Sequence, residues 1–171
     1  MAMVRLLQPE DAAAWRDLRL HGLAHNPQAF GASLAEEQDL PLDWFAERLG
    51  STPVFGAADA TGVMTGTVGL GFMRGEKVRH KGFLWGMYVR PEARGAGLGR
   101  ALLQAAIAHA TGRVEQLRLD VVADNAAALA LYRRAGFSAY GTEPRALKLG
   151  EDYLDEVLMA LRLPPAPAAP G

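Results

Sequence analysis

The sequence contains no cysteine among its 171 residues. Disulfide bonds, cysteine zinc sites and a cysteine nucleophile are therefore excluded, and the redox compartment stays open. An excess of charge is also missing, because 18 Lys and Arg residues face 19 Asp and Glu residues, for a net charge of −1. This balance removes the usual argument for a surface that binds nucleic acid or an anionic membrane.

Long apolar runs are missing as well. No run approaches the length of a membrane span, and the N-terminus shows no signal-peptide core before Glu10 and Asp11. Half of the residues are apolar and 22% are charged, which is an ordinary globular composition. We therefore expect a cytoplasmic protein with one domain over residues 1–163 and a disordered Pro- and Ala-rich tail over residues 164–171. Neither nucleic acid nor a membrane is expected as a partner.

Hydrophobic periodicity predicts seven strands and four helices. The strands are expected at residues 3–7, 54–58, 63–74, 82–89, 115–122, 137–140 and 151–163, and the helices at 12–23, 41–49, 98–110 and 125–135. Residues 28–41 are expected to be irregular, and the glycines within 63–74 predict a bulge or close packing. Hairpins mixed with helical crossovers predict an α/β (α+β layered) fold, with a mixed sheet of six to seven strands and about four helices on its faces.

A glycine-rich turn, Arg94–Arg100, joins the strand at 82–89 to the helix at 98–110. Its glycines let backbone N–H groups converge, and the helix N-terminus carries partial positive charge, so the turn suits a phosphorylated ligand. A Walker loop is excluded because no Gly-Lys-Ser/Thr ending follows. A dinucleotide site is a rival, since Gly95 and Gly97 fit its fingerprint, although Arg100 replaces the third glycine; Asp120 lies near the place of a ribose-binding acid. A tight turn without a ligand is the third alternative.

Two motifs decide between these alternatives. Arg94-x-x-Gly97-x-Gly99, after a strand ending in Tyr88-Val89-Arg90-Pro91, resembles motif A of the GNAT superfamily of N-acetyltransferases. The downstream run Asp124-Asn125-x-x-Ala128-x-x-x-Tyr132-x-x-x-Gly136-Phe137 resembles motif B of the same superfamily. The resemblance implies a mostly antiparallel sheet whose two central parallel strands, here 83–89 and 117–122, splay apart to hold acetyl-CoA.

The resemblance also implies how the donor is held. The amides of Arg94–Gly99 would hold the pyrophosphate, the backbone of Met87–Val89 would pair with the pantetheine arm, and the amide near Val89 would stabilise an oxyanion. Tyr132 is the expected general acid for the leaving thiolate, with core packing as the alternative, and Asn125 is a CoA contact, a helix N-cap or both. The expected CoA contacts are Met87, Tyr88, Val89, Arg94, Gly95, Ala96, Gly97, Leu98, Gly99, Arg100, Asn125, Ala128 and Tyr132.

The acceptor half of the reaction is harder to read. Many members of the superfamily carry a glutamate near the start of the strand that reaches the thioester, but His80-Lys81-Gly82-Phe83 has no carboxylate there. Glu36 is the candidate base, with Glu37, His80 and a water relay as alternatives, and a solvated acidic loop is the plainer reading of the glutamates. Phe30, Glu37, Tyr153 and Asp155 are candidates for the substrate pocket. Phe30, Trp44, Phe45 and Trp85 either line an apolar pocket or pack in the core, and no metal is expected.

The sequence therefore predicts an acetyl-CoA-dependent N-acetyltransferase that transfers the acetyl group directly, through a tetrahedral intermediate, to a primary amine. Two alternatives remain, a CoA-binding sensor or interaction module without turnover and, less favoured, a dinucleotide-binding protein. The acceptor is left open among a small amine, an amino acid, an antibiotic and a peptide or protein N-terminus. A homodimer is also left open.

Overall fold

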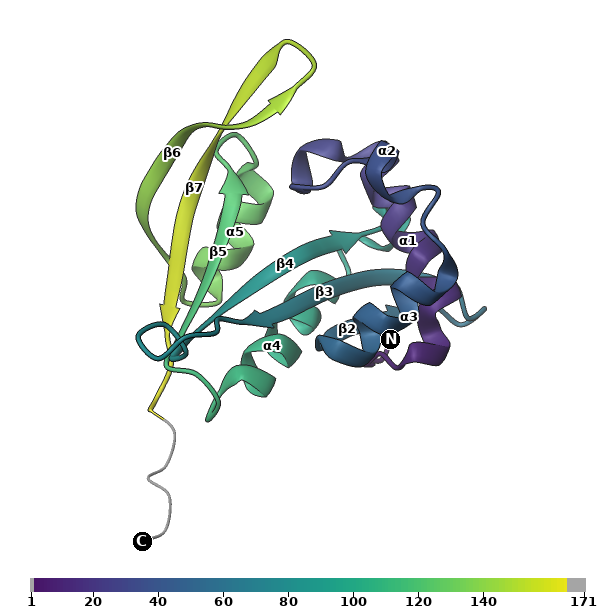
Figure 1. Cartoon of the computed structure of the whole chain (residues 1–171), viewed down its shortest axis with the longest axis horizontal. Helices are drawn as coiled ribbons and strands as arrows, with labels where there is room; N and C mark the ends of the chain where they lie inside the picture. The colour runs from purple at the N-terminus through teal and green to yellow at the C-terminus, as the bar shows by residue number, and fades with distance from the viewer. Residues whose placement is uncertain (1, 166–171) are drawn as a thin grey trace, which may run out of the picture.

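The structure, a computed structural model, describes residues 2–165, so the predicted disordered tail lies outside the described residues from position 166 onward. Its seven strands form one sheet in the order β1-β2-β3-β4-β5-β7-β6 (Figure 1). β4 and β5 are parallel, and the other neighbouring pairs are antiparallel, which confirms the predicted fold class. The strands are β1 (Arg5–Leu6), β2 (Val54–Ala58), β3 (Met64–Phe72), β4 (Lys81–Val89), β5 (Gln116–Val122), β6 (Ser138–Leu149) and β7 (Asp152–Arg162).

Helices cover both faces of this sheet. They are α1 (Ala12–His25), α2 (Leu34–Glu37), α3 (Leu42–Ser51), α4 (Leu98–Ala110) and α5 (Ala126–Arg134). On one face, α1 and α3 bury Trp15, Leu18 and Phe45 in one hydrophobic cluster. On the other face, α4 and α5 form a second cluster with the alternating Leu117, Leu119 and Val121 of β5. No helix within residues 2–165 is long and apolar enough to cross a membrane.

The sheet splits between its two parallel strands. Paired residues of β4 and β5 run only from Lys81–Gln116 to Phe83–Arg118, and Figure 1 shows the two strands diverging beyond that point. The register between β3 and β4 also shifts, because two residues of β4, Gly86 and Met87, stand opposite the single residue Val68 of β3. Gly86 adopts a left-handed φ of +60°, and such a bulge bends a strand, so it helps to turn β4 away from β5.

Glycine is required in β3 opposite the bulge. A Cβ placed on Gly69 would lie 2.1 Å from the ring of Trp85, so the indole occupies the space of the missing side chain. The predicted bulge or close packing around the glycines of β3 is therefore confirmed: β3 has an extra residue, Thr65, opposite β2, and β4 has one opposite β3.

Several predicted boundaries are wrong, including those of α2, α3 and β6. The irregular segment contains α2, which begins at a capping box: the hydroxyl of Ser33 accepts the N–H of Glu36 at 3.3 Å, and the carboxylate of Glu36 accepts the N–H of Ser33 at 2.7 Å. The helix predicted to close at Gly50 continues to Ser51. The strand predicted at residues 137–140 extends to Leu149. The prediction is too short because β6 is a largely exposed edge strand and lacks the apolar alternation that marks buried strands.

Candidate active site

The glycine turn presents a row of backbone N–H groups. Gly95 and Gly97 both have φ of +82°, and Gly97 is the N-cap of α4. Within residues 2–165 the N–H groups from Gly95 to Arg100 have no intramolecular acceptor; the first that does is Ala101, which donates to the carbonyl of Gly97 at 3.0 Å. A Cβ on Gly95 or Gly97 would meet no atom within 4 Å, so space is open beside the turn. Six free donors at a helix N-terminus are suited to bind an anionic group.

Arg94 connects this turn to the end of β4. Its Nε donates to the carbonyl of Val89 at 2.9 Å, and its guanidinium lies 5.9 Å from the ring centre of Tyr88. The side chain of Tyr88 is buried, and its hydroxyl forms a hydrogen bond with Nδ1 of His21 at 2.9 Å. Tyr88 therefore has only its backbone available for a ligand in the split of the sheet.

The backbone of Val89 faces this split. Arg90 donates its N–H to the carbonyl of Thr65 on β3 at 2.8 Å. Because the backbone groups of successive residues in a strand point to opposite sides, the N–H of Val89 points away from β3. The pairs between β4 and β5 end at Phe83, so this part of β4 is an open edge that an extended ligand can pair with.

The second motif places its residues on α5, beside the start of α4. A Cβ on Gly99 of α4 would lie 3.4 Å from the side chain of Leu131, so the two helices are in close contact there. The side chain of Asn125 accepts the N–H of Ala128 at 3.1 Å, which confirms the N-cap reading of this residue and leaves its contact with CoA a prediction.

Tyr132 is almost completely buried and packs edge-on against Phe137, with ring centres 6.0 Å apart. Burial raises the pKa of Tyr132 to about 12. In the described part of the chain, its hydroxyl has no hydrogen-bond partner. The phenol is therefore protonated at neutral pH and has a donor to offer.

The two glutamates proposed for the acceptor side have other partners. Glu36 is fully exposed, and its hydrogen bonds from the N–H and hydroxyl of Ser33 lower its pKa. Glu37 is buried and receives two hydrogen bonds from Arg19, Nε to Oε2 at 2.5 Å and Nη2 to Oε1 at 2.7 Å. Glu36 thus caps α2 and Glu37 neutralises an arginine, so neither geometry supports a role as base.

Tyr153 and Asp155 lie on the β6–β7 hairpin. The ring of Tyr153 is 46% exposed and carries the guanidinium of Arg145 at 3.7 Å, while Asp155 accepts the N–H of Arg145 at 2.8 Å. Arg145 has a left-handed φ of 54°, so these contacts hold a strained turn in β6. The split between β4 and β5 contains a hollow, and Tyr153, Asp155 and the exposed His80 are not among the residues that line it.

A hollow of about 510 Å³ lies in the split between β4 and β5, within the size range of small-molecule sites. Phe30 lies in its wall, as predicted, whereas Glu37 does not. The residues that line it come from α1, α3 and the segment before α2, from the turn after β3, and from β4, β5, β6 and β7. They are Arg19, Ala29, Phe30, Gly31, Ala32, Arg48, Met73, Phe83, Leu84, Trp85, Gly86, Arg118, Leu119, Asp120, Leu147 and Glu156.

The sequence did not predict a role for Arg19, Arg48, Arg118 or Glu156 of this wall, and it singled out Asp120 only as a possible ribose-binding acid. Arg19 follows the buried Leu18 on the apolar face of α1, and a lone arginine on such a face is a signal that could have been used. Asp120 and Glu156 are the carboxylates in the wall, from β5 and β7. Burial, followed by the charges of Asp120 and Glu143, raises the pKa of Glu156 above its ordinary value.

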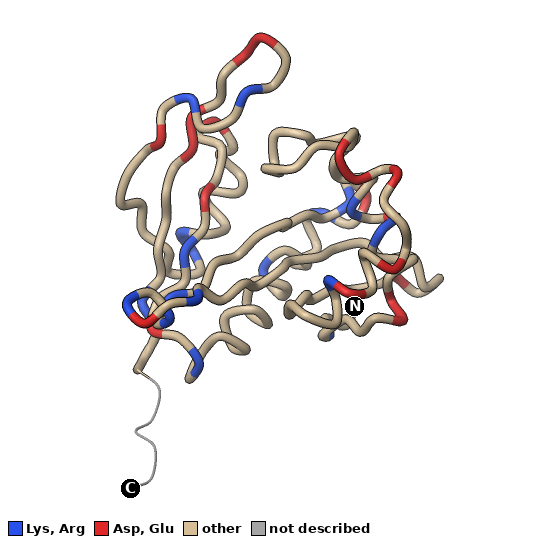
Figure 2. The backbone as a smooth tube through the Cα atoms, in the orientation of Figure 1, with Lys and Arg blue, Asp and Glu red and all other residues tan. Residues whose placement is uncertain are grey.

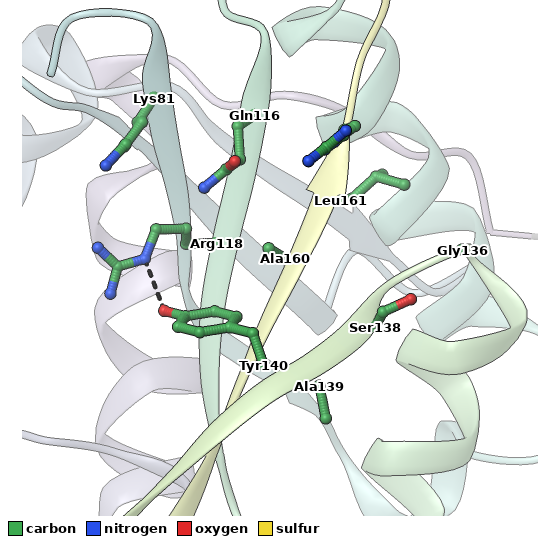
Figure 3. Close-up of a pocket in the computed structure, with 10 residues that line it drawn as sticks. Lys81, Gln116, Arg118, Gly136, Ser138, Ala139, Tyr140, Ala160 and Leu161 are labelled. Carbon is green, nitrogen blue, oxygen red and sulfur yellow. Dashed lines mark hydrogen bonds between the residues drawn. The ribbon is translucent and has the colours of Figure 1, made fainter.

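A second hollow, of about 670 Å³, lies at the paired ends of β4 and β5 and is shown in Figure 3. The small residues Ser138, Ala139 and Ala160 are part of its lining, and so are Arg118 and Tyr140, where Arg118 Nε donates to the hydroxyl of Tyr140 at 2.9 Å. Gly86, the residue of the bulge, lines the hollow in the split and not this one, so the hollow in the split is the better candidate for chemistry. Figure 2 shows basic and acidic segments interspersed over most elements.

Comparisons with known proteins agree with this geometry. The family model described as "Acetyltransferase (GNAT) family" matches residues 15–137. The yncA protein of Salmonella typhimurium, described as an acetyltransferase and solved with its cofactor acetyl-CoA, is 26% identical, with a TM-score of 0.79 over 100% of this chain and 98% of that chain.

Three curated relatives differ in their acceptors. The L-methionine sulfoximine/L-methionine sulfone acetyltransferase of Pseudomonas aeruginosa is 34% identical over 86% of this chain and 91% of that protein. The aminoglycoside N(6')-acetyltransferase type 1 of Stenotrophomonas maltophilia is 32% identical over 78% of this chain and 84% of that protein. The mycothiol acetyltransferase of Streptomyces bingchenggensis is 34% identical over 82% of this chain, which spans only 44% of that protein.

Proposed function

Because the chain belongs to the acetyltransferase (GNAT) family, we propose that it moves the acetyl group of acetyl-CoA to a primary amine by direct attack through a tetrahedral intermediate. The predicted family is confirmed, and with it the class of acetyl-CoA-dependent N-acetyltransferases. One observation carries the proposal for this chain: the pairing of β4 and β5 ends at Phe83, and the open edge of β4 leads to a turn with six free N–H groups. We also propose that residues 1–163 form one domain, which carries this activity.

The donor fits the first half of the site. The amides of residues 95–100, with the dipole of α4 behind them, bind the pyrophosphate. The exposed edge of Met87–Val89 pairs with the amides of the pantetheine arm, as one more strand would. The N–H of Val89, which points into the split, donates to the thioester carbonyl and stabilises the negative charge that forms there during attack.

Tyr132 acts at the sulfur. With a pKa of about 12, the phenol keeps its proton at neutral pH. Full transfer of that proton to a thiolate of ordinary pKa, near 8.5, would be uphill by about 5 kcal/mol. Tyr132 therefore assists the departure of the thiolate chiefly as a hydrogen-bond donor, and becomes a full acid only where bound substrate lowers its pKa.

The acceptor amine enters from the hollow in the split. A protonated amine cannot attack, so its proton has to pass to a group in the wall or to water. Asp120 and Glu156 are the carboxylates that line the hollow, and we propose them, directly or through water, as proton acceptors in place of Glu36. The raised pKa of Glu156 brings it closer to the working pH of a general base.

The test is release of free CoA thiol in the presence of acetyl-CoA and a panel of amines, amino acids and peptides. The protein has no cysteine, so a thiol reagent gives no background from the chain itself. Turnover with at least one amine is expected. Tight CoA binding without turnover on any acceptor would support the sensor alternative, and protection from heat by a nicotinamide dinucleotide but not by CoA would support the dinucleotide alternative.

A further inference from the structure

Arg48 projects from α3 into the wall of the hollow, and Glu37, the carboxylate whose charge reaches it, is already paired with Arg19. Its guanidinium lies 4.4 Å from the ring centre of Trp85 and 5.2 Å from that of Trp44. Over residues 2–165 its side chain takes part in no hydrogen bond or ion pair, although it is half-buried. Burial and then the charge of Arg19 lower the pKa of Arg48. An arginine remains charged in such a place, so an unbalanced positive charge stays in the wall.

The neighbouring Arg19 does not balance that charge, because its own partner is already engaged. Glu37 accepts from both Nε and Nη2 of Arg19, which leaves the Nη1 group for other acceptors. That Nη1 lies 3.2 Å from where a Cβ of Gly86 would be, at the bulge of β4 and thus at the edge of the split. The two arginines and the one glutamate leave a net charge of +1 at this end of the hollow.

Aromatic rings surround both guanidinium groups. Arg19 lies between Trp15, Phe30 and Trp85, 5.6–5.8 Å from their ring centres. Arg48 lies over Trp85 as well. A guanidinium that stacks on a ring keeps its N–H groups free at its edge, and that edge matches the two oxygens of a carboxylate. The stacking therefore prepares a planar fork for a carboxylate rather than a diffuse positive surface.

The opposite wall has the other sign. Asp120 and Glu156 contribute carboxylates from β5 and β7; Arg118 of β5 also lines this hollow, and its Nε donates to the hydroxyl of Tyr140. One small cavity thus has cations from α1 and α3 at one end and carboxylates from the sheet at the other. A molecule with an anionic group and an amine a few bonds apart matches both ends.

We propose that the acceptor is an α-amino acid or a close analogue, whose carboxylate is held by Arg48 and the free edge of Arg19 while its amine faces Asp120 and Glu156. This inference rests on the proposed function, because it names the substrate class of the same site. The proposal favours one kind of acceptor named among the relatives over another. The carboxylate of an amino acid, such as that of the Pseudomonas enzyme, fits Arg48, whereas a polycationic aminoglycoside is repelled by it.

The experiment measures binding first and turnover second. The full chain, loaded with CoA, is titrated calorimetrically with the common L-amino acids, with the α-carboxamides of those that bind, and with kanamycin. At least one amino acid is expected to bind about ten-fold or more tighter than its carboxamide, as hydrogen bonds to a charged group imply. Arg48→Gln is expected to remove that difference by weakening the acid alone, and Arg48→Lys to keep part of it, since lysine retains the charge but not the fork.

Two controls separate recognition from folding. Arg48→Met retains an apolar chain over Trp85, so loss of acid selectivity with an unchanged melting temperature and CoA affinity identifies the lost charge as the cause. Arg113→Gln removes the same charge from an exposed turn beyond α4 and is expected to change neither ligand series. The inference is overturned if no amino acid binds, if acid and carboxamide bind equally, if kanamycin binds better, or if Arg48→Gln weakens both ligands alike.

The turnover arm, read as thiol release with acetyl-CoA, distinguishes the two proposals. Selective binding of amino acids without any transfer would contradict the proposed function and leave the recognition by Arg48 standing. Transfer to acids and carboxamides with equal kcat/KM would support the proposed function and contradict the recognition of a carboxylate by Arg48.

Discussion

Glu37→Gln should destabilise the fold strongly, because it removes the anion from a buried pair. Both partners are 5% exposed, and the two hydrogen bonds between them measure 2.5 and 2.7 Å. Glutamine has nearly the same shape but cannot balance the guanidinium of Arg19, which would remain charged among aromatic rings and beside Arg48. Breaking a buried pair on one side costs about 3–5 kcal/mol. For a chain of this size that corresponds to a fall in Tm of about 6–20 °C.

The measurement is thermal and urea unfolding of the wild type, Glu37→Gln and a control. Arg5→Gln breaks the exposed pair with Asp11, in which the arginine side chain is 50% exposed, so it should cost no more than about 1 kcal/mol. Replacing both partners of the buried pair, with Arg19→Met and Glu37→Leu together, should recover most of the loss, because no charge is left unpaired. A Glu37→Gln protein as stable as the Arg5→Gln control would refute this reasoning.

Four further substitutions test other parts of the molecule. Tyr132→Phe should keep CoA affinity and lower kcat by about 10–10²-fold, the loss expected for a hydrogen bond to a developing charge; with its pKa of about 12 in the free protein, Tyr132 should cause no alkaline loss of kcat/KM below about pH 10. Gly97→Ala should weaken CoA binding in calorimetry and cost about 1–2 kcal/mol, because φ there is +82°. Gly69→Ala should lower Tm by displacing Trp85. Glu156→Gln should raise Tm at pH 7 but not at pH 4: a carboxyl whose pKa is raised in the folded state loses stability as pH rises from its ordinary pKa through the raised value.

The donor side could be predicted from the sequence because backbone conformation selects its residues. Gly95 and Gly97 stand where φ is +82°, which side chains disfavour, so the glycine pattern carries the shape of the turn directly. The alternation of Leu117, Leu119 and Val121 likewise follows from one buried face of β5. At these positions the local backbone conformation or the burial of one strand face selects the residue type, so the local sequence predicts the local structure.

The rest could not be predicted, because its cause is not local. β6 is an exposed edge strand that pairs with β7 through two register shifts, and polar edge residues leave no periodic pattern. Arg19 stands out on the apolar face of α1, but its proximity to Arg48 arises only when α1 packs beside α3, so no local pattern predicts the pair. The start of α2 is an exception, because its cause is local. The spacing of Ser33 and Glu36 is that of a capping box and predicts a helix start, although from the sequence we expect an irregular acidic segment there.

Under the proposed function, this difference accounts for one family of acetyltransferases whose members are named for different acceptors. In the proposed function the donor is held by the main-chain amides of residues 95–100 and the edge of β4, and main-chain groups of this kind tolerate much sequence change. The acceptor end depends on a few side chains, such as Arg48 and Glu156, that a single substitution alters. Relatives 32–34% identical to this chain are named for an amino acid analogue, an aminoglycoside and mycothiol. The acceptor of this chain therefore has to be inferred from the charges in its own cavity, where the unpaired Arg48 favours a carboxylate over another cation.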